Sequence, residues 1–237
     1  MAKDSPLLEG FKEILSGGLF SDLVVICGNK SFNVHKNVLH AMSPVFRKML
    51  TGEFKEAKQG SITLEHDEPD IIASMLHFFY NAEILSAATA ATAADQDTIK
   101  AEGSYMVKVY AIADKYDVPS LRHQATTQLA GALRLERKQT HLKELIATIR
   151  AIDEHTADST LWKIVIPEII RDLGWLSQDN DFSVLLQEMP ALTKALLTST
   201  AKGLEASNSK AAFAQDVVGY LETEADINYY GAKRTVE

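Results

Sequence analysis

The chain has 237 residues, of which 46% are hydrophobic and 24% are charged. This balance is typical of a globular protein with a sizeable core, and the length suits a compact domain with an extension. The net charge of −8, without any basic run, argues against nucleic-acid binding, because phosphate contacts need clustered lysine and arginine. The single cysteine, Cys27, excludes an internal disulfide and a cysteine-rich zinc site and favours a reducing compartment.

The sequence also lacks the motifs that mark several other classes of protein. The N-terminal residues carry no continuous apolar stretch like that of a signal peptide, and no segment approaches the roughly 20 apolar residues of a membrane span. The seven histidines show no metal-ligand spacing, and there is no nucleophile elbow, phosphate loop or dinucleotide fingerprint. We therefore expect an intracellular protein of the nucleus or cytoplasm that is not an enzyme and uses no cofactor, metal or small-molecule substrate.

The first predicted elements are a helix and a hairpin. Apolar residues recur at helical spacing in residues 7–15, and Gly17-Gly18 ends the pattern, so a short amphipathic helix is expected. A buried apolar run at 23–27 and an alternating run at 31–35 flank a turn and predict two paired strands. Cys27 is expected to be a buried strand residue.

Helical and strand patterns continue to about residue 80. Apolar residues three and four positions apart predict helix over 38–50, and Ser43-Pro44 divides it into two pieces. Residues 61–64 predict a third strand. A proline and acidic residues then precede a strong apolar stripe at 71–79, which predicts a core helix.

The next segment, 86–97, is low in complexity and is expected to be a mobile insertion. Two helices follow at about 106–116 and 121–133, joined by a tight corner. Beyond residue 138 only helical patterns occur, with Pro167 inside one of them and Gly174 expected to end it.

The order of elements over residues 5–135 resembles that of the BTB/POZ domain, an α+β fold with a small mixed sheet flanked by helices. Residues 21–50, SDLVVICGNKSFNVHKNVLHAMSPVFRKML, are similar to the opening signature of the family, with an Asp-hydrophobic strand, Phe-x-Val-His-Lys and Ser-Pro-x-Phe. The match continues through 54–84 and resumes at 106–129. The segment after residue 138 resembles the helical tail of short fungal-type BTB proteins.

The resemblance implies a division of the chain into four parts. These are an N-terminal helix in 1–20, a BTB/POZ domain in 21–137 that contains the insertion 86–97, an all-helical extension in 138–225, and a tail in 226–237 that is expected to be flexible. No repeats of the kind that build a kelch propeller are present.

The resemblance also implies a symmetric dimer. In family dimers the N-terminal helix packs across the two-fold axis, and a self-complementary apolar face suits such an interface. The residues that match it are Leu7, Leu8, Phe11 and Ile14. Asp22 and Lys36 match the positions that form a charged pocket near the dimer groove; alternatively Asp22 caps the strand entry and Lys36 is solvated. His35, inside the signature, is expected to be a hydrogen-bonded core residue.

Phe54 and Glu56 fit the hydrophobic-x-Glu pattern with which BTB adaptors contact cullin-3. An exposed aromatic side chain could fill a pocket on the partner while the carboxylate pairs with its basic rim, as in interface hot spots. The alternative is a packed Phe54 beside a solvated Glu56.

The function implied by the resemblance is protein–protein interaction. Its most concrete form is a homodimeric adaptor that links a partner or substrate protein to a cullin-3 ubiquitin ligase. The alternatives are a scaffold in a transcriptional or signalling complex and, more remotely, an enzyme whose site the sequence does not reveal.

Overall fold

The computed structural model describes residues 18–51, 60–90, 102–133, 139–156 and 159–203. The expected N-terminal helix, the segment that contains Phe54 and Glu56, most of the insertion and the C-terminal tail lie outside these ranges. The chain forms two compact units, Met1–Glu168 and Ile169–Glu237. Each is described separately below.

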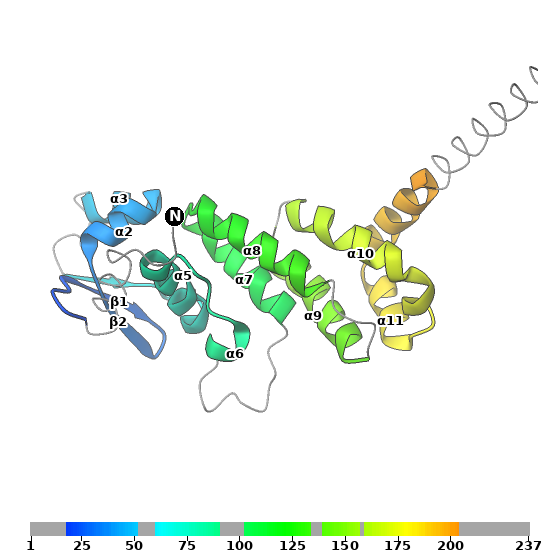
Figure 1. Cartoon of the computed structure of the whole chain (residues 1–237), viewed down its shortest axis with the longest axis horizontal. Coiled ribbons are helices and arrows are strands. Elements are labelled where there is room, and N and C mark those ends of the chain that lie inside the picture. The colour runs from blue at the N-terminus through cyan, green and yellow to red at the C-terminus, as the bar shows by residue number, and fades with distance from the viewer. Residues whose placement is uncertain (1–17, 52–59, 91–101, 134–138, 157–158, 204–237) are drawn as a thin grey trace, which may run out of the picture. The chain divides into compact units, whose positions relative to one another are not determined.

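A three-stranded mixed sheet forms the start of the first unit (Figure 1). Strands β1 (Leu23–Cys27) and β2 (Lys30–Val34) are antiparallel, with Val25 opposite Phe32. Strand β3 (Ser61–Thr63) pairs with β1 in parallel, with Ile62 opposite Val25, so β1 lies in the centre. Alternate β1 residues are buried, as expected for a strand with one covered face, and Cys27 is fully buried. The predicted hairpin and third strand are confirmed.

Two short helices follow the hairpin, as the sequence predicts. Helix α2 (Lys36–Met42) ends at Ser43, and α3 (Pro44–Thr51) begins with a proline, whose missing N–H is not needed in the first turn. The hydroxyl of Ser43 accepts from the Phe46 N–H at 3.2 Å and donates to the Tyr116 carbonyl at 2.5 Å. The corner between the helices is thereby bound to a distant part of the chain.

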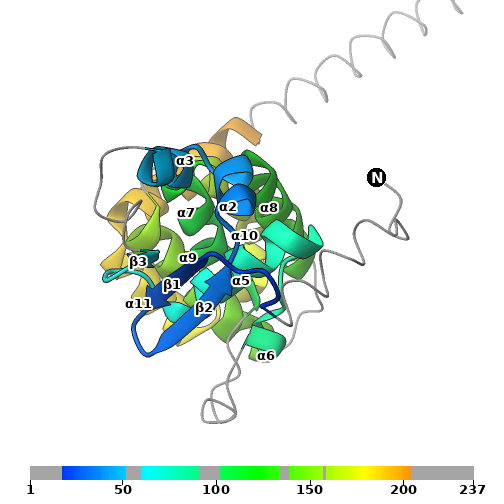
Figure 2. The same cartoon turned by 90° about the vertical axis from the view of Figure 1, so that its left-hand side faces the viewer.

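The core of the first unit is built around the predicted apolar helix, α5 (Pro69–Asn81), of which most residues are buried. In Figure 2 the strands β1 and β2 lie in front of it. Helix α7 (Glu102–Lys115) packs on α5 and on α8 (Pro119–Ala132). Within the low-complexity segment, α6 (Ala87–Ala90) forms one helical turn whose first N–H donates to Glu102 Oε2 at 3.0 Å.

Helix α9 (Gln139–His155) begins where the helical extension is expected, yet it belongs to the first unit because it packs on α7. Helix α10 (Thr160–Leu176) contains the division between the units at Glu168. It runs through both Pro167 and Gly174, so the expected end at Gly174 was wrong. Gly174 does not take the left-handed conformation that ends a helix, and the apolar stripe continues to the buried Leu176.

The rest of the second unit is also helical. Helix α11 (Asn180–Glu188) is capped by Asp179, whose Oδ1 accepts from the N–H groups of Asp181 and Phe182 at 2.8 and 3.3 Å. A further helical stretch covers 190–203. Among the described residues, no helix has the length and apolar character needed to cross a bilayer.

Candidate partner-binding site

The start of α2 is fixed by hydrogen bonds around the buried His35. Its N–H donates to the Tyr80 hydroxyl at 3.0 Å, and its Nδ1 lies 2.9 Å from the same oxygen. Its Nε2 lies 2.8 Å from the Leu19 carbonyl oxygen, which can only accept, so in a neutral ring Nε2 carries the proton and Nδ1 accepts from Tyr80. Burial raises the pKa of Tyr80, which keeps this hydroxyl protonated. The predicted core role of His35 is confirmed.

The structure brings Asp22 and Lys36 together, but through the main chain. Oδ1 of Asp22 accepts from the backbone N–H of Lys36 at 2.8 Å. Lys36 is the first residue of α2, and the N-cap residue, His35, makes no side-chain capping bond. Asp22 therefore satisfies one of the helix's unpaired N–H groups from outside the helix. Whether the two side chains also form a charged pocket in a dimer stays a prediction.

The turn before β1 presents two exposed apolar side chains. Leu19 is 58% exposed and Phe20 is 82% exposed. Phe20 also has a positive φ of 62°, a conformation that bulky residues rarely adopt, and the bond from His35 to the Leu19 carbonyl helps to hold it. The turn thus displays a large aromatic side chain at the point where the chain passes from the N-terminal segment into the sheet.

A second network joins the loop before α5 to the end of α7. The Tyr116 hydroxyl donates to Asp67 Oδ2 at 2.8 Å, and Lys115 Nζ lies 2.6 Å from Asp67 Oδ1. Sγ of Cys27 lies 3.2 Å from the Asp67 carbonyl oxygen, to which it donates. Burial and the bond to the carboxylate raise the pKa of Tyr116, and burial raises the pKa of Cys27. The Tyr116 ring also stacks on Phe46 of α3 at 4.8 Å between centroids.

Two of the predicted sites lie outside the described residues. Phe54 and Glu56 fall in the chain between the end of α3 at Thr51 and the start of β3 at Ser61. The dimer residues Leu7, Leu8, Phe11 and Ile14 precede Gly18, the first described residue. Both sets stay predictions. Among the described residues, no three His, Cys, Asp or Glu side chains are grouped as metal ligands would be.

A family model and several known proteins are similar to this chain. The BTB/POZ domain model matches residues 11–132, more than half of the chain. Kelch-like protein 40 of Homo sapiens is 33% identical over 115 residues, which are 48% of this chain and 16% of that protein. BTB/POZ and MATH domain-containing protein 3 of Arabidopsis thaliana is 26% identical over 205 residues, or 85% of this chain and 47% of that protein.

One more relative and one solved structure are also similar to this chain. BTB and MATH domain-containing protein 42 of Caenorhabditis elegans is 31% identical over 141 residues, which are 59% of this chain and 30% of that protein. The solved BTB domain of zebrafish PATZ1 aligns over 52% of this chain and 86% of its own, with 18% identity and a TM-score of 0.39. The chain spans between 16% and 47% of the length of the three relatives.

The mixed sheet, the helical pair after it and the family match define the class of protein. The chain belongs to the BTB/POZ family, and its fold is the α+β BTB/POZ fold followed by a helical C-terminal region. BTB/POZ domains mediate protein–protein interaction, so the chain contains a protein-interaction module.

Proposed function

We propose that the chain is a dimeric adaptor that links a partner protein to a cullin-3 ubiquitin ligase. The observation that supports the proposal most is the position of Phe54 and Glu56 within the matched family region, between α3 and β3. The first turn of α3 is also tied to the core, because Phe46 stacks on Tyr116 and packs edge-on against Phe79.

In this mechanism the chain itself catalyses nothing. It raises the effective concentration of a substrate near the ligase, and two copies in a dimer add avidity without any new contact. The exposed Leu19 and Phe20 support the dimeric form, since they lie directly after the segment with the predicted dimer residues and offer apolar surface.

Calorimetric titration of the full chain with the N-terminal region of cullin-3 tests the adaptor role. We expect saturable binding, and at least roughly tenfold weaker binding when Phe54→Ala is combined with Glu56→Ala, because an anchor and its rim charge are both removed. The matched control is Val184→Ala with Glu188→Ala, an exposed apolar and acidic pair on α11, which should bind like the unaltered chain.

Absence of binding, or equal binding by the Phe54 and Glu56 variant and its control, would overturn the adaptor role. Light scattering on the same samples should give the mass of two chains. If binding fails and loss of the chain dissolves a complex without changing partner half-lives, the scaffold role is the correct one.

A further inference from the structure

The sheet of the first unit has one buried and one exposed face. In β1, Leu23, Val25 and Cys27 point to the buried face, so Val24 and Ile26 point to the other. The residues that pair with these two in β2 and β3 are small and polar. We call this surface the outer face of the sheet, and it consists of Val24, Ile26, Ser31, Asn33, Ser61 and Thr63.

The outer face and the turn before it hold most of the large apolar side chains that are exposed. Of five such side chains among the described residues, three lie here, Leu19 at 58%, Phe20 at 82% and Ile26 at 36% exposure. The outer face carries no charged side chain. Its central strand offers apolar contact and its rim offers hydroxyl and amide groups, so it suits an apolar stripe of a partner element.

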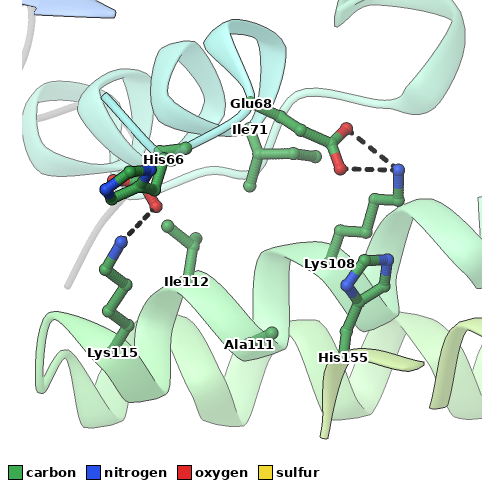
Figure 3. A pocket seen from close by; sticks show the side chains of 9 residues that line it. His66, Glu68, Ile71, Lys108, Ala111, Ile112, Lys115 and His155 are labelled. Atoms are coloured by element: carbon green, nitrogen blue, oxygen red, sulfur yellow. Dashed lines mark hydrogen bonds and ion pairs between the residues drawn. The ribbon is translucent and has the colours of Figure 1, made fainter. Parts of the chain in front are cut away.

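Another surface of the first unit is less suited to apolar contact. A cavity of about 340 Å³ lies between the loop before α5 and helix α7 (Figure 3). Lys108 binds Glu68 there and Lys115 binds Asp67, so ion pairs line the cavity. An apolar element that covered the cavity would remove these charges from water without giving them new partners, which is costly. Covering the outer face carries no such cost.

The outer face is small. Three strands about 4.8 Å apart and at most five residues long cover about 250 Å². A stable interface between two folded proteins buries about 800 Å² on each side. The outer face therefore fits one short element better than a second folded copy of the chain.

The chain itself supplies such an element beside this face. Residues 1–17 lie outside the described residues and join the structure at Gly18. A Cβ atom built on Gly18 would lie 3.4 Å from Cβ of Asn33, so the chain leaves the structure at a corner of the outer face. The helix that the sequence predicts over 7–15 would be about 14 Å long, against about 17 Å for the five residues of β1. Its apolar stripe consists of Leu7, Leu8, Phe11, Ile14 and Leu15.

We propose that residues 7–15 dock as an amphipathic helix on the outer face of their own sheet. Only Ser16 and Gly17 join this segment to the described structure, so its effective concentration at the outer face is high. The predicted dimer contact uses the same apolar residues, so a chain with a docked N-terminus is an autoinhibited monomer. The docking stands by itself, whereas the autoinhibition rests on the dimeric adaptor proposed above.

A spin label on the full chain tests the docking. Glu9→Cys, on the polar side of the predicted helix, carries a nitroxide, and the fully buried Cys27 stays unlabelled. Nuclear magnetic resonance then follows the isoleucine methyl groups. We expect the label to broaden the signal of Ile26 and not that of Ile149 in α9, because α9 lies on the far side of α7 from the sheet (Figure 1).

Two further substitutions in the labelled chain provide matched variants. Phe11→Ser removes an apolar side chain from the middle of the stripe and should reduce the broadening of Ile26 at least about fivefold. Glu13→Ser, on the opposite side of the predicted helix, leaves the stripe intact and should retain the broadening.

A mixed sample identifies the occupant. It combines chains that carry the nitroxide but no isotope with isotope-labelled chains that carry no nitroxide. Broadening of Ile26 there as strong as in the first sample would make a second copy the occupant. That result, an Ile26 signal that the label does not broaden, or equal losses in the Phe11 and Glu13 variants would overturn the docking.

Analytical ultracentrifugation of Ile26→Thr tests the autoinhibition. Threonine keeps the branched shape that suits a strand but is more polar, so fewer chains have a docked N-terminus. The dimer dissociation constant should become at least about threefold smaller. Val184→Thr, a similarly exposed branched residue outside the sheet, is the control and should leave the constant unchanged.

An unchanged or larger dissociation constant for Ile26→Thr would overturn the autoinhibition alone. If the unaltered chain and Ile26→Thr both remain single chains at all concentrations, the autoinhibition and the dimeric form of the adaptor both fail. The spin-label result decides the docking in either case.

Discussion

The carboxylate of Asp22 binds the main chain of Lys36, so its effect on stability should not depend on the lysine side chain. We expect Asp22→Ala to lower the free energy of unfolding by about 1 kcal/mol, as the loss of a capping bond does. Lys36→Ala keeps the backbone N–H donor and should change the free energy of unfolding by less than about 0.5 kcal/mol. Denaturant unfolding of both variants measures the difference, and equal losses would show that an ion pair, not the cap, links the two residues.

At the scale of single residues, the sequence predicted which residues lie near each other better than it predicted which of their atoms form bonds. The signature placed Asp22 near Lys36, but it could not show that the bond goes to the main chain, because that depends on where α2 begins. The cavity was not predicted. Periodicity selected the buried face of α7, while Lys108 and Lys115 lie on the other face and meet their acidic partners only through the packing of α5 on α7.

Helices α7 and α9 approach each other closely at Gly103. A Cβ atom built there would lie 2.3 Å from Oγ1 of the buried Thr148, far inside van der Waals contact. Gly103→Ala should therefore lower the free energy of unfolding by about 1–3 kcal/mol, because the helices must separate. Gly131→Ala is the control. It has open space around it in α8 and should stabilise the chain by up to about 1 kcal/mol.

A double-mutant cycle identifies the cause of the Gly103 effect. Thr148→Ala removes the clashing atoms, so the combination of Gly103→Ala with Thr148→Ala should recover at least about 1 kcal/mol relative to the sum of the single changes. Additive effects would mean that backbone freedom at Gly103, rather than its contact with Thr148, determines the cost.

At the scale of elements the sequence was most informative where one pattern excluded others. The hairpin, the break at Ser43-Pro44 and the helix at α5 were predicted because alternation, proline and a dense apolar stripe each favour one structure. The end of α10 was mispredicted because a glycine ends a helix only if the chain needs a left-handed residue there. Its neighbours allow the helix to continue.

The whole molecule should lose stability in alkaline solution. Three of its seven tyrosines, Tyr80, Tyr105 and Tyr116, have raised pKa values because burial disfavours their charged forms. For Tyr105 the pKa is raised to about 12, and the carboxylates of Glu102 and Asp70 contribute. The unfolded chain ionises near pH 10, so this stability is complete below pH 10 and is lost as the pH rises toward 12.

Tyrosinate absorbance and unfolding followed together across this range measure the effect. Tyr105→Phe should reduce the alkaline loss of stability, by on the order of 2 kcal/mol at pH 12, with little change at pH 7. The hydroxyl of Tyr105 is buried near that of Ser74, and neither makes a hydrogen bond of standard geometry among the described residues, so its removal should cost little stability at pH 7. If Tyr105→Phe loses as much stability between pH 10 and pH 12 as the unaltered chain, Tyr105 does not cause the alkaline loss.

The order of the sheet has a consequence for folding. Strand β1 pairs with β2 across a tight turn, whereas its pairing with β3 closes a loop that includes α2 and α3. Closing the longer loop costs more chain entropy, so the hairpin can form early and β3 joins once the two helices have collapsed onto the core. The chain segment with Phe54 and Glu56 has its ends brought together only in this late step. A newly made chain would thus become competent to bind its proposed partner only at the end of folding.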